Sequence, residues 1–181
     1  MQDQQDQLGL LADQVPFRLT TPADVRIARD WLIDEGRSKD ASLLARSAIL
    51  FFAEHSLHAI RMRWVIARRE PIVWLNRRAS DDYHQQQGTL CKSLRRLGSS
   101  RRLATQLGHL EQAREAVNLM TDLRKQHTQD GTSNVGHFRL RFLGDMLDEL
   151  ILLTRSELAA LQESDTWRKR QSRCVSTATV R

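Results

Sequence analysis

The chain has little of what disulfide frameworks, tight loops and many-stranded folds require. Its 181 residues include only two cysteines, three prolines and eight glycines. Cys91 and Cys174 are far apart and neither belongs to a Cys-x-x-Cys pair, so neither a disulfide framework nor a redox motif is indicated. Because few breakers interrupt the chain, long helices are favoured over many short strands. The composition therefore predicts a mainly α-helical protein.

Targeting and membrane signals are also lacking. The first residues, MQDQQDQ, have neither the basic flank nor the apolar stretch of a signal peptide. No run of about 18 apolar residues occurs, so no membrane span is expected. We therefore expect a cytoplasmic protein that has no membrane partner.

Catalytic motifs are equally scarce. The sequence has no phosphate-binding loop and no nucleophile elbow. His55 and His58 lie three residues apart but have no evident third partner for a metal. Asp145, Asp148 and Glu149 are most simply the solvated face of a helix. We expect no enzyme activity, no cofactor and no metal.

Positive charge is what the chain has in excess. Lys and Arg number 28 against 22 Asp and Glu, which gives a formal net charge of +6. This balance suits a polyanion such as nucleic acid, although it also fits an inert solvated surface. Basic residues dominate between Ser56 and Arg102. Arg95 and Arg96 in this segment are candidate contacts to a DNA backbone.

The N-terminal part predicts a strand followed by two helices. Val15, Phe17 and Leu19 alternate with polar residues or proline over 15–20, a period of two that predicts a short strand. Thr21 is a good N-cap and Pro22 suits the first helical position, so a helix should run from about 22 to 35 and end at Gly36. A second helix should start at 38 or 40 and reach 55, or continue toward 69.

The C-terminal part predicts further helices. Residues 72–97 indicate one or two short helices, and 99–123 carries apolar residues at the spacing of a long helix. A turn over 129–136 precedes a last long helix from about 137 to 162. Because the turn is short, these two long helices should form an antiparallel hairpin. The polar, basic residues 164–181 predict a disordered tail.

A lone strand has no pairing partner, and about 40 residues bury too little surface to fold alone, so residues 15–55 should be completed by a second copy. Three segments of this stretch carry a family resemblance: the strand Phe17-Arg18-Leu19, the turn Gly36-Arg37-Ser38, and the helix Ser42 to Ile49 with Phe52. This stretch resembles the ribbon-helix-helix family, Arc-like and MetJ-like DNA-binding dimers. The turn is about one residue longer than the family's commonest form.

The resemblance implies a paired ribbon that enters the DNA major groove. Side chains alternate between the two faces of a strand, so Pro16, Arg18 and Thr20 would point away from the core. These three residues would contact the bases. Those that would contact phosphates at the start of the second helix are Arg37, Ser38 and Lys39. A dimer core would form from Phe17, Leu19, Trp31, Leu44, Ile49 and Phe52. The alternatives are a solvated charge at Arg18 and an ordinary helix cap at Ser38.

The resulting organisation is a flexible arm (1–14), a ribbon-helix-helix domain (15–55), a helical domain (56–163) and a basic tail (164–181). The expected function is sequence-specific binding of double-stranded DNA as a homodimer or higher homo-oligomer. By analogy with the family, the protein would act in plasmid conjugation as a relaxosome accessory protein, or in transcription regulation of a plasmid. In the first role its partner would be a relaxase or other DNA-processing protein. The alternative is a helical interaction or adaptor protein that does not bind DNA.

Overall fold

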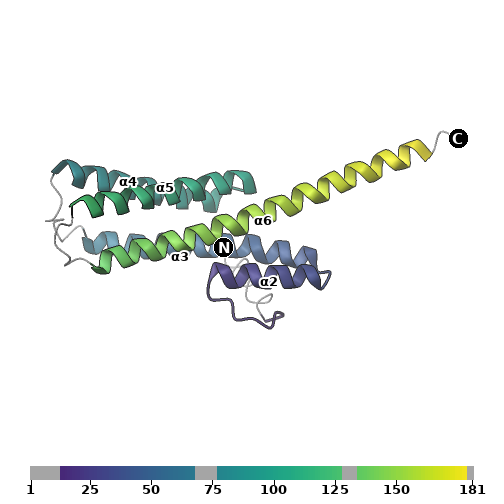
Figure 1. The fold of residues 1–181 in the computed structure, drawn as a ribbon, viewed down its shortest axis with the longest axis horizontal. Coiled ribbons are helices and arrows are strands. Elements are labelled where there is room, and N and C mark those ends of the chain that lie inside the picture. The colour runs from purple at the N-terminus through teal and green to yellow at the C-terminus, as the bar shows by residue number, and fades with distance from the viewer. Residues whose placement is uncertain (1–12, 68–76, 128–133, 179–181) are drawn as a thin grey trace.

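The computed structural model describes residues 13–67, 77–127 and 134–178, and the side chains of 13–58, 78–126 and 139–166. These residues form five α-helices (Figure 1). In chain order, the helices are α2 (Pro22–Asp34), α3 (Ser38–Ala67), α4 (Arg77–Ser99), α5 (Leu103–His127) and α6 (Asn134–Ala178).

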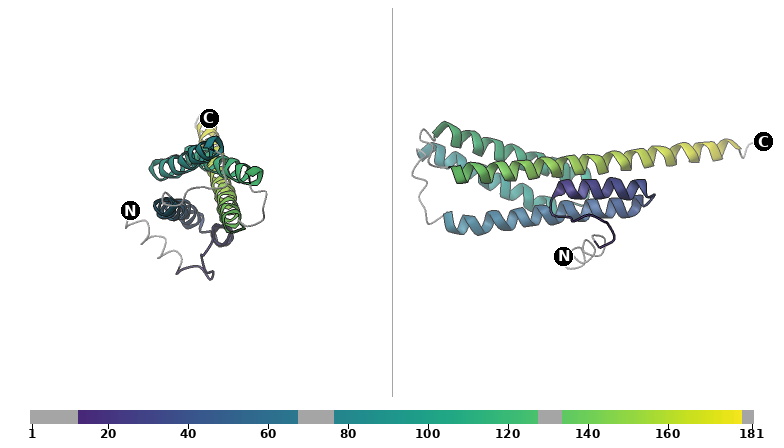
Figure 2. Two further views of the ribbon diagram at one scale, coloured as in Figure 1. Left: turned by 90° about the vertical axis from the view of Figure 1, so that its left-hand side faces the viewer. Right: turned by 60° about the horizontal axis from the view of Figure 1, so that its bottom comes forward.

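Helices α3 to α6 form a four-helix bundle. Each packs against the next, and α6 closes the ring by packing against α3. Figure 2 shows α4 and α5 on one side of α6, with α2 and α3 on the other. Helix α2 contacts only α3 and α6 among the described helices, so it covers the groove between them. The predicted antiparallel hairpin of the two long C-terminal helices is confirmed as α5 and α6, and α4 packs on α5 in the same way.

One hydrophobic core runs through all five helices. Fully buried side chains come from every helix and include Leu32, Leu44, Leu90, Leu110 and Leu150. Apolar residues at the three- and four-residue spacing of a helix supply them, since that spacing puts them on one face. The sequence boundary predicted between 55 and 56 falls inside α3, which continues without a break.

Helix α2 begins and ends where the sequence predicts. Thr21 caps it, since its hydroxyl accepts from the Asp24 backbone N–H at 3.2 Å while the Asp24 carboxylate accepts from the Thr21 N–H at 2.8 Å. This reciprocal pair is a capping box, and Pro22 fills the first turn without losing a hydrogen bond. Gly36 takes a φ of 75°, a left-handed conformation that a side chain would strain.

The predicted N-terminal strand is wrong, and with it the ribbon-helix-helix fold. The described residues contain no strand, and 18–20 have no regular secondary structure. Val15 is buried and Phe17 lies edge-on to Trp31 of α2, with ring centroids 6.0 Å apart. The alternating apolar residues therefore pack on the protein's own α2 and α3. A pattern that predicts a strand is found here in an irregular segment that covers the core.

Helix α6 differs from the prediction at its C-terminal end. It continues to Ala178, through most of the segment 164–181 for which the sequence predicts disorder. Phe142 of this helix is 65% exposed, whereas Leu150 and Leu153 are fully buried. No helix in the described parts of the chain combines the length and apolar character needed to cross a membrane.

The α2 cap should make stability depend on pH. The Thr20 hydroxyl, which donates to the Asp24 carboxylate at 2.7 Å, and the Thr21 hydrogen bonds hold the pKa of Asp24 below its usual value. Because this pKa is lower in the folded state, the ionised carboxylate stabilises the fold at pH values above the unfolded-state pKa of about 3.9. This stabilisation is lost as the pH falls through the folded-state pKa. Asp24→Asn should therefore lower the free energy of unfolding at pH 7, and the difference between the two proteins should shrink as the pH falls below about 3.9. Urea unfolding of both proteins across this range measures it; a gap that is unchanged at pH 3 would contradict the assignment.

Candidate nucleic-acid interface

A group of exposed basic side chains lies where α4 turns into α5. Lys92, Arg95 and Arg96 are three and four residues apart, so they share one face of α4, opposite the buried Leu90, Leu94 and Leu97. Two more basic residues follow in the connection between the helices. We call the set the basic turn, and its members, all exposed, are Lys92, Arg95, Arg96, Arg101 and Arg102.

Hydrogen bonds fix the backbone of the basic turn. The Gln106 side chain, which is buried, donates from Nε2 to the Ser100 carbonyl oxygen at 2.8 Å. The Ser99 and Ser100 hydroxyls donate to the Arg96 carbonyl oxygen at the end of α4. The Gln106 backbone N–H donates to the Arg102 carbonyl at 3.0 Å and so starts α5. The arginines are therefore mounted on a defined turn, and their side chains remain in solvent.

The basic turn differs from several arginines of the bundle in having no acidic partners among the described residues. Arg26, Arg114 and Arg155 each pair with a carboxylate of a neighbouring helix. By contrast, no carboxylate of a described residue lies within ion-pair distance of the basic turn, and the sequence has no Asp or Glu between Asp82 and Glu111. The charge of the turn is therefore available to an external anion.

The predicted phosphate contacts fall into two groups that the fold separates. Arg95 and Arg96 belong to the basic turn, whereas Arg37, Ser38 and Lys39 lie where α3 begins. In Figure 1 the α4–α5 connection lies above α6 and the α2–α3 connection lies below it. The Arg37 guanidinium also donates to the Asp40 carboxylate at 2.8 Å and to the Gln14 side chain at 2.6 Å. The positive charge of Arg37 at the start of α3 is therefore partly neutralised by Asp40.

The residues predicted to contact bases do not lie on a β-ribbon in the described structure. Pro16 and Arg18 are exposed on the irregular segment before α2. Thr20, through its backbone N–H and its hydroxyl, donates to Asp24 and so belongs to the α2 cap. Nothing in the described structure aligns these three side chains along a paired strand.

The residues predicted to form a dimer core pack within one chain. Leu44 and Ile49 are fully buried, and the four others are half-buried against the same core: Phe17, Leu19, Trp31 and Phe52. A second copy was needed to pair the predicted strand, and the part of the chain that the structure describes contains no strand. Dimerisation itself stays a prediction.

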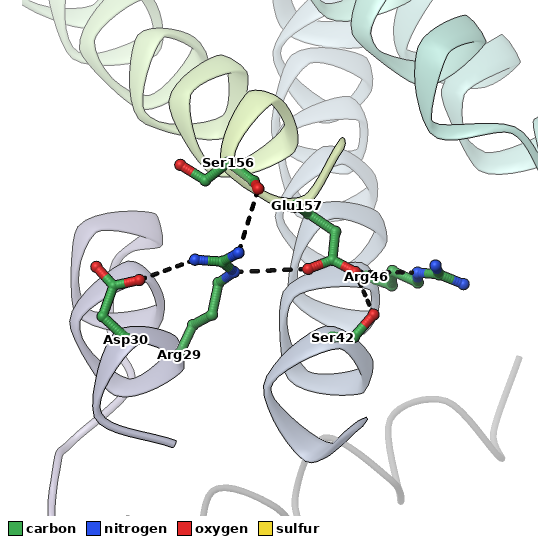
Figure 3. Close-up of polar contacts among 6 residues, drawn as sticks. All are labelled: Arg29, Asp30, Ser42, Arg46, Ser156 and Glu157. Atoms are coloured by element: carbon green, nitrogen blue, oxygen red, sulfur yellow. Dashed lines mark hydrogen bonds and ion pairs between the residues drawn. The ribbon is translucent and has the colours of Figure 1, made fainter. Parts of the chain in front are cut away.

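A buried ionic cluster, which the sequence reasoning missed, joins α2 and α3 to α6 (Figure 3). Glu157 of α6 is only 2% exposed and Arg29 of α2 only 5%. Arg29 Nε lies 3.5 Å from Glu157 Oε2, and Arg46 Nε lies 3.6 Å from Oε1. The Ser42 hydroxyl donates to the same carboxylate. We call these four residues the Glu157 cluster.

The remaining hydrogen bonds of Arg29 complete the cluster. Its guanidinium donates to the Ser156 carbonyl oxygen at 3.2 Å and to the Asp30 carboxylate at 2.8 Å. The signal in the sequence was a charged residue inside an apolar stripe: Arg29 follows Ala28 and precedes Leu32, and both of these are buried. A buried charge is retained only when it is paired, so these charges position helices and are not a binding surface.

The described residues hold no group of three or more His, Cys, Asp or Glu side chains that could bind a metal ion. His55 packs against Phe51, with ring centroids 4.6 Å apart, and His58 is exposed. The basic turn is therefore the arrangement in the described structure that best suits an external ligand, and that ligand is anionic.

Comparisons of the chain with protein-family models, with curated protein sequences and with solved structures give no match.

The Glu157 cluster makes a testable contribution to stability. Arg29→Met leaves the buried Glu157 carboxylate with weaker compensation and should lower the free energy of unfolding by about 3 kcal/mol. The double variant Arg29→Met/Glu157→Met should lose less than the sum of the two single variants, because neither charge is then left buried alone. Urea unfolding of all four proteins measures this coupling.

Arg155→Met is the control. It removes an arginine whose exposed pair with Glu111, at 2.7 Å, should contribute no more than about 1 kcal/mol. Strictly additive losses at Arg29 and Glu157 would show that the two side chains do not stabilise each other.

Proposed function

We propose that the protein binds double-stranded DNA by its phosphate backbone, with the basic turn as the contact surface. The observation that carries the proposal is that five exposed basic side chains cluster at one turn without acidic partners among the described residues. Opposite charge attracts a polyanion over a distance, and release of its counterions favours binding. A merely solvated surface would more commonly mix both signs of charge.

The spacing on α4 suits a nucleic-acid strand. From Lys92 to Arg96 the helix axis advances about 6 Å, and one strand of a DNA duplex presents a phosphate about every 3.4 Å along its axis. Arg95 and Arg96 can each bind a phosphate with two parallel N–H donors, which gives a defined geometry. The N-terminal end of α5, beside Arg101 and Arg102, adds the partial positive charge of a helix dipole.

Contacts to phosphates fix position and do not read sequence. The proposal therefore concerns binding to duplex DNA as such. Sequence-specific recognition and a role in plasmid transfer or regulation stay predictions, since the ribbon that was to read bases is absent from the described residues.

A second candidate function is that of a helical interaction protein that does not bind DNA. The observation in its favour is Phe142 of α6, whose ring is 65% exposed. Large aromatic side chains commonly anchor protein interfaces. Such a protein would keep its partner when the basic turn is neutralised and lose it on Phe142→Ala.

Neutralising two arginines tests the DNA proposal. Arg95→Gln/Arg96→Gln should weaken binding to a random-sequence duplex and reduce the slope of log K against log salt by about 1.8, at about 0.9 for each lost phosphate contact. Fluorescence anisotropy across a salt series measures both quantities. Because both side chains are exposed, the thermal unfolding temperature should stay the same.

Arg139→Gln/Arg141→Gln is the matched control. These two arginines are exposed near the start of α6, far along the bundle from the α4–α5 turn, and removing them changes the net charge equally (Figure 1). The control should keep the slope of the unmodified protein. Equal losses for the two double variants would mean that DNA responds only to net charge, and no loss in either would favour the interaction protein.

A further inference from the structure

A serine lies among the arginines of the basic turn. Ser99 is the last residue of α4, and it is exposed. It stands four residues after Arg95 and three after Arg96, so the three side chains share one face of α4. Its hydroxyl donates to the Arg96 carbonyl oxygen at 2.9 Å. A group attached to this hydroxyl would therefore lie beside the two arginines that the proposed function assigns to DNA phosphates.

The residues before Ser99 suit an enzyme that transfers a phosphoryl group. Protein kinases select a serine partly by the charges next to it, and arginines that precede the serine fit an acidic groove on the kinase. Arg95 and Arg96 are placed in this way. The sequence has no Asp or Glu between Asp82 and Glu111, so no neighbouring acid opposes that recognition.

The end of α4 can open locally to present this serine. A kinase binds its substrate as an extended segment, so the last turn of α4 has to unwind. Gly98 lies in that turn, and glycine is the least favourable helix residue after proline. Helix ends also open more readily than helix centres. Residues 98–100 can unwind while Leu97, which is fully buried, stays in the core.

Two further hydroxyls that follow a pair of arginines are placed differently. Ser80 lies in the first turn of α4 and is half-buried, and Thr105 lies in the first turn of α5. In both, several turns of helix continue after the hydroxyl, and their backbone hydrogen bonds hold it in place. Ser99 is followed instead by residues 100–102, which have no regular secondary structure. Ser99 therefore combines the arginine pair with exposure and with a helix end.

We propose that Ser99 is a phosphorylation site and that its phosphate closes the basic turn to DNA. The proposal rests on the proposed function, because it concerns regulation of that surface. In the reaction, the Ser99 Oγ attacks the γ-phosphorus of a nucleoside triphosphate that a separate protein kinase holds. The bond from this phosphorus to the leaving nucleoside diphosphate breaks, and the hydroxyl proton passes to a base of the kinase.

The phosphate would act on the basic turn through its charge and through the arginines that it engages. It carries about −1.5 to −2 charges at pH 7, against the five positive charges of the turn. Residues three and four apart on a helix are neighbours, so the phosphate on Ser99 can accept hydrogen bonds from Arg95 and Arg96. The N-terminal end of α5 offsets the unfavourable dipole at the end of α4. Arginines that bind an internal phosphate are no longer available to DNA.

The test begins with phosphate transfer to the full-length protein. An arginine-directed serine kinase and MgATP are incubated with the unmodified chain, with Ser99→Ala and with Ser100→Ala, and the modified residues are mapped by mass spectrometry. Ser100→Ala is the matched control, because it removes the adjacent hydroxyl, which also donates to the Arg96 carbonyl oxygen. Phosphate should be found on Ser99 in the unmodified chain and in Ser100→Ala. Its absence from Ser99 overturns the proposal, whichever other residues are modified.

The second measurement is DNA binding by proteins that carry phosphoserine at one position, installed by genetic code expansion. The two positions are 99 and 80. Position 80 lies about 28 Å back along α4, so a phosphate there adds the same charge away from the turn. Each protein is titrated with a random-sequence duplex across a salt series by fluorescence anisotropy.

Phosphoserine at position 99 should reduce the slope of log K against log salt by about 1.8, as Arg95→Gln/Arg96→Gln does. Phosphoserine at position 80 should leave the slope unchanged. In the Arg95→Gln/Arg96→Gln background, phosphoserine at position 99 should reduce the slope little further, because the two phosphate contacts are already lost.

The outcomes separate the regulation from the proposed function. If DNA binding depends on Arg95 and Arg96 but phosphoserine at position 99 leaves the slope unchanged, the Ser99 proposal is wrong and DNA binding by the turn stands. Equal losses from positions 80 and 99 would mean that DNA responds to net charge alone, which also overturns the proposal. If the unmodified protein does not bind DNA, the proposed function is wrong, and the phosphate-transfer measurement by itself decides whether Ser99 accepts phosphate.

Discussion

The Glu157 carboxylate is the constraint around which the N-terminal and C-terminal parts of this protein are arranged. A buried carboxylate is costly unless cations and donors surround it, and here they come from two other helices: Arg29 from α2, and Ser42 and Arg46 from α3. Leucines alone would allow α2 to slide or rotate in the groove between α3 and α6. The ionic contacts are directional, and they therefore select one position for α2.

The same cluster determines how α6 leaves the bundle. Glu157 lies one helical turn before Leu161, which packs on the core and is the last residue to do so among the described side chains of α6. Helix α6 is thus held by α2, α3 and α5 immediately before it continues alone. A projecting helix transmits a defined direction only if its base is held in this way.

Several elements could be predicted from the sequence because their signals are local. Thr21, Pro22 and Gly36 mark the ends of α2 by hydrogen bonding and backbone conformation that act within one turn of helix. The hairpin of α5 and α6 follows from apolar spacing and a short connection. Local charge alone predicts Arg95 and Arg96 as phosphate contacts; the structure places them on an exposed face of α4, and the contact itself stays a prediction.

What the sequence could not provide depends on contacts between distant segments. Phe17 and Leu19 alternate with polar residues as in a strand, but their partners are the protein's own core and Trp31, which periodicity cannot reveal. Glu157 looks like any other acidic residue of a long helix until α2 and α3 are placed beside it. The helical extension to Ala178 was hidden by its polar composition, which is equally typical of disorder.

The connectivity of the bundle also sets an order of assembly. Helices α3 to α6 follow one another by short connections, so each can pack on its neighbour soon after both have formed, and only short loops need to close. The Arg29 contact with Ser156 spans 127 positions in the chain. A chain emerging from the ribosome can therefore pack α2 against α3, but it cannot make this contact until nearly all of α6 is complete. Until then, the face of α2 that meets α6 is exposed, so α2 is fully sheltered only when the C-terminal helix arrives.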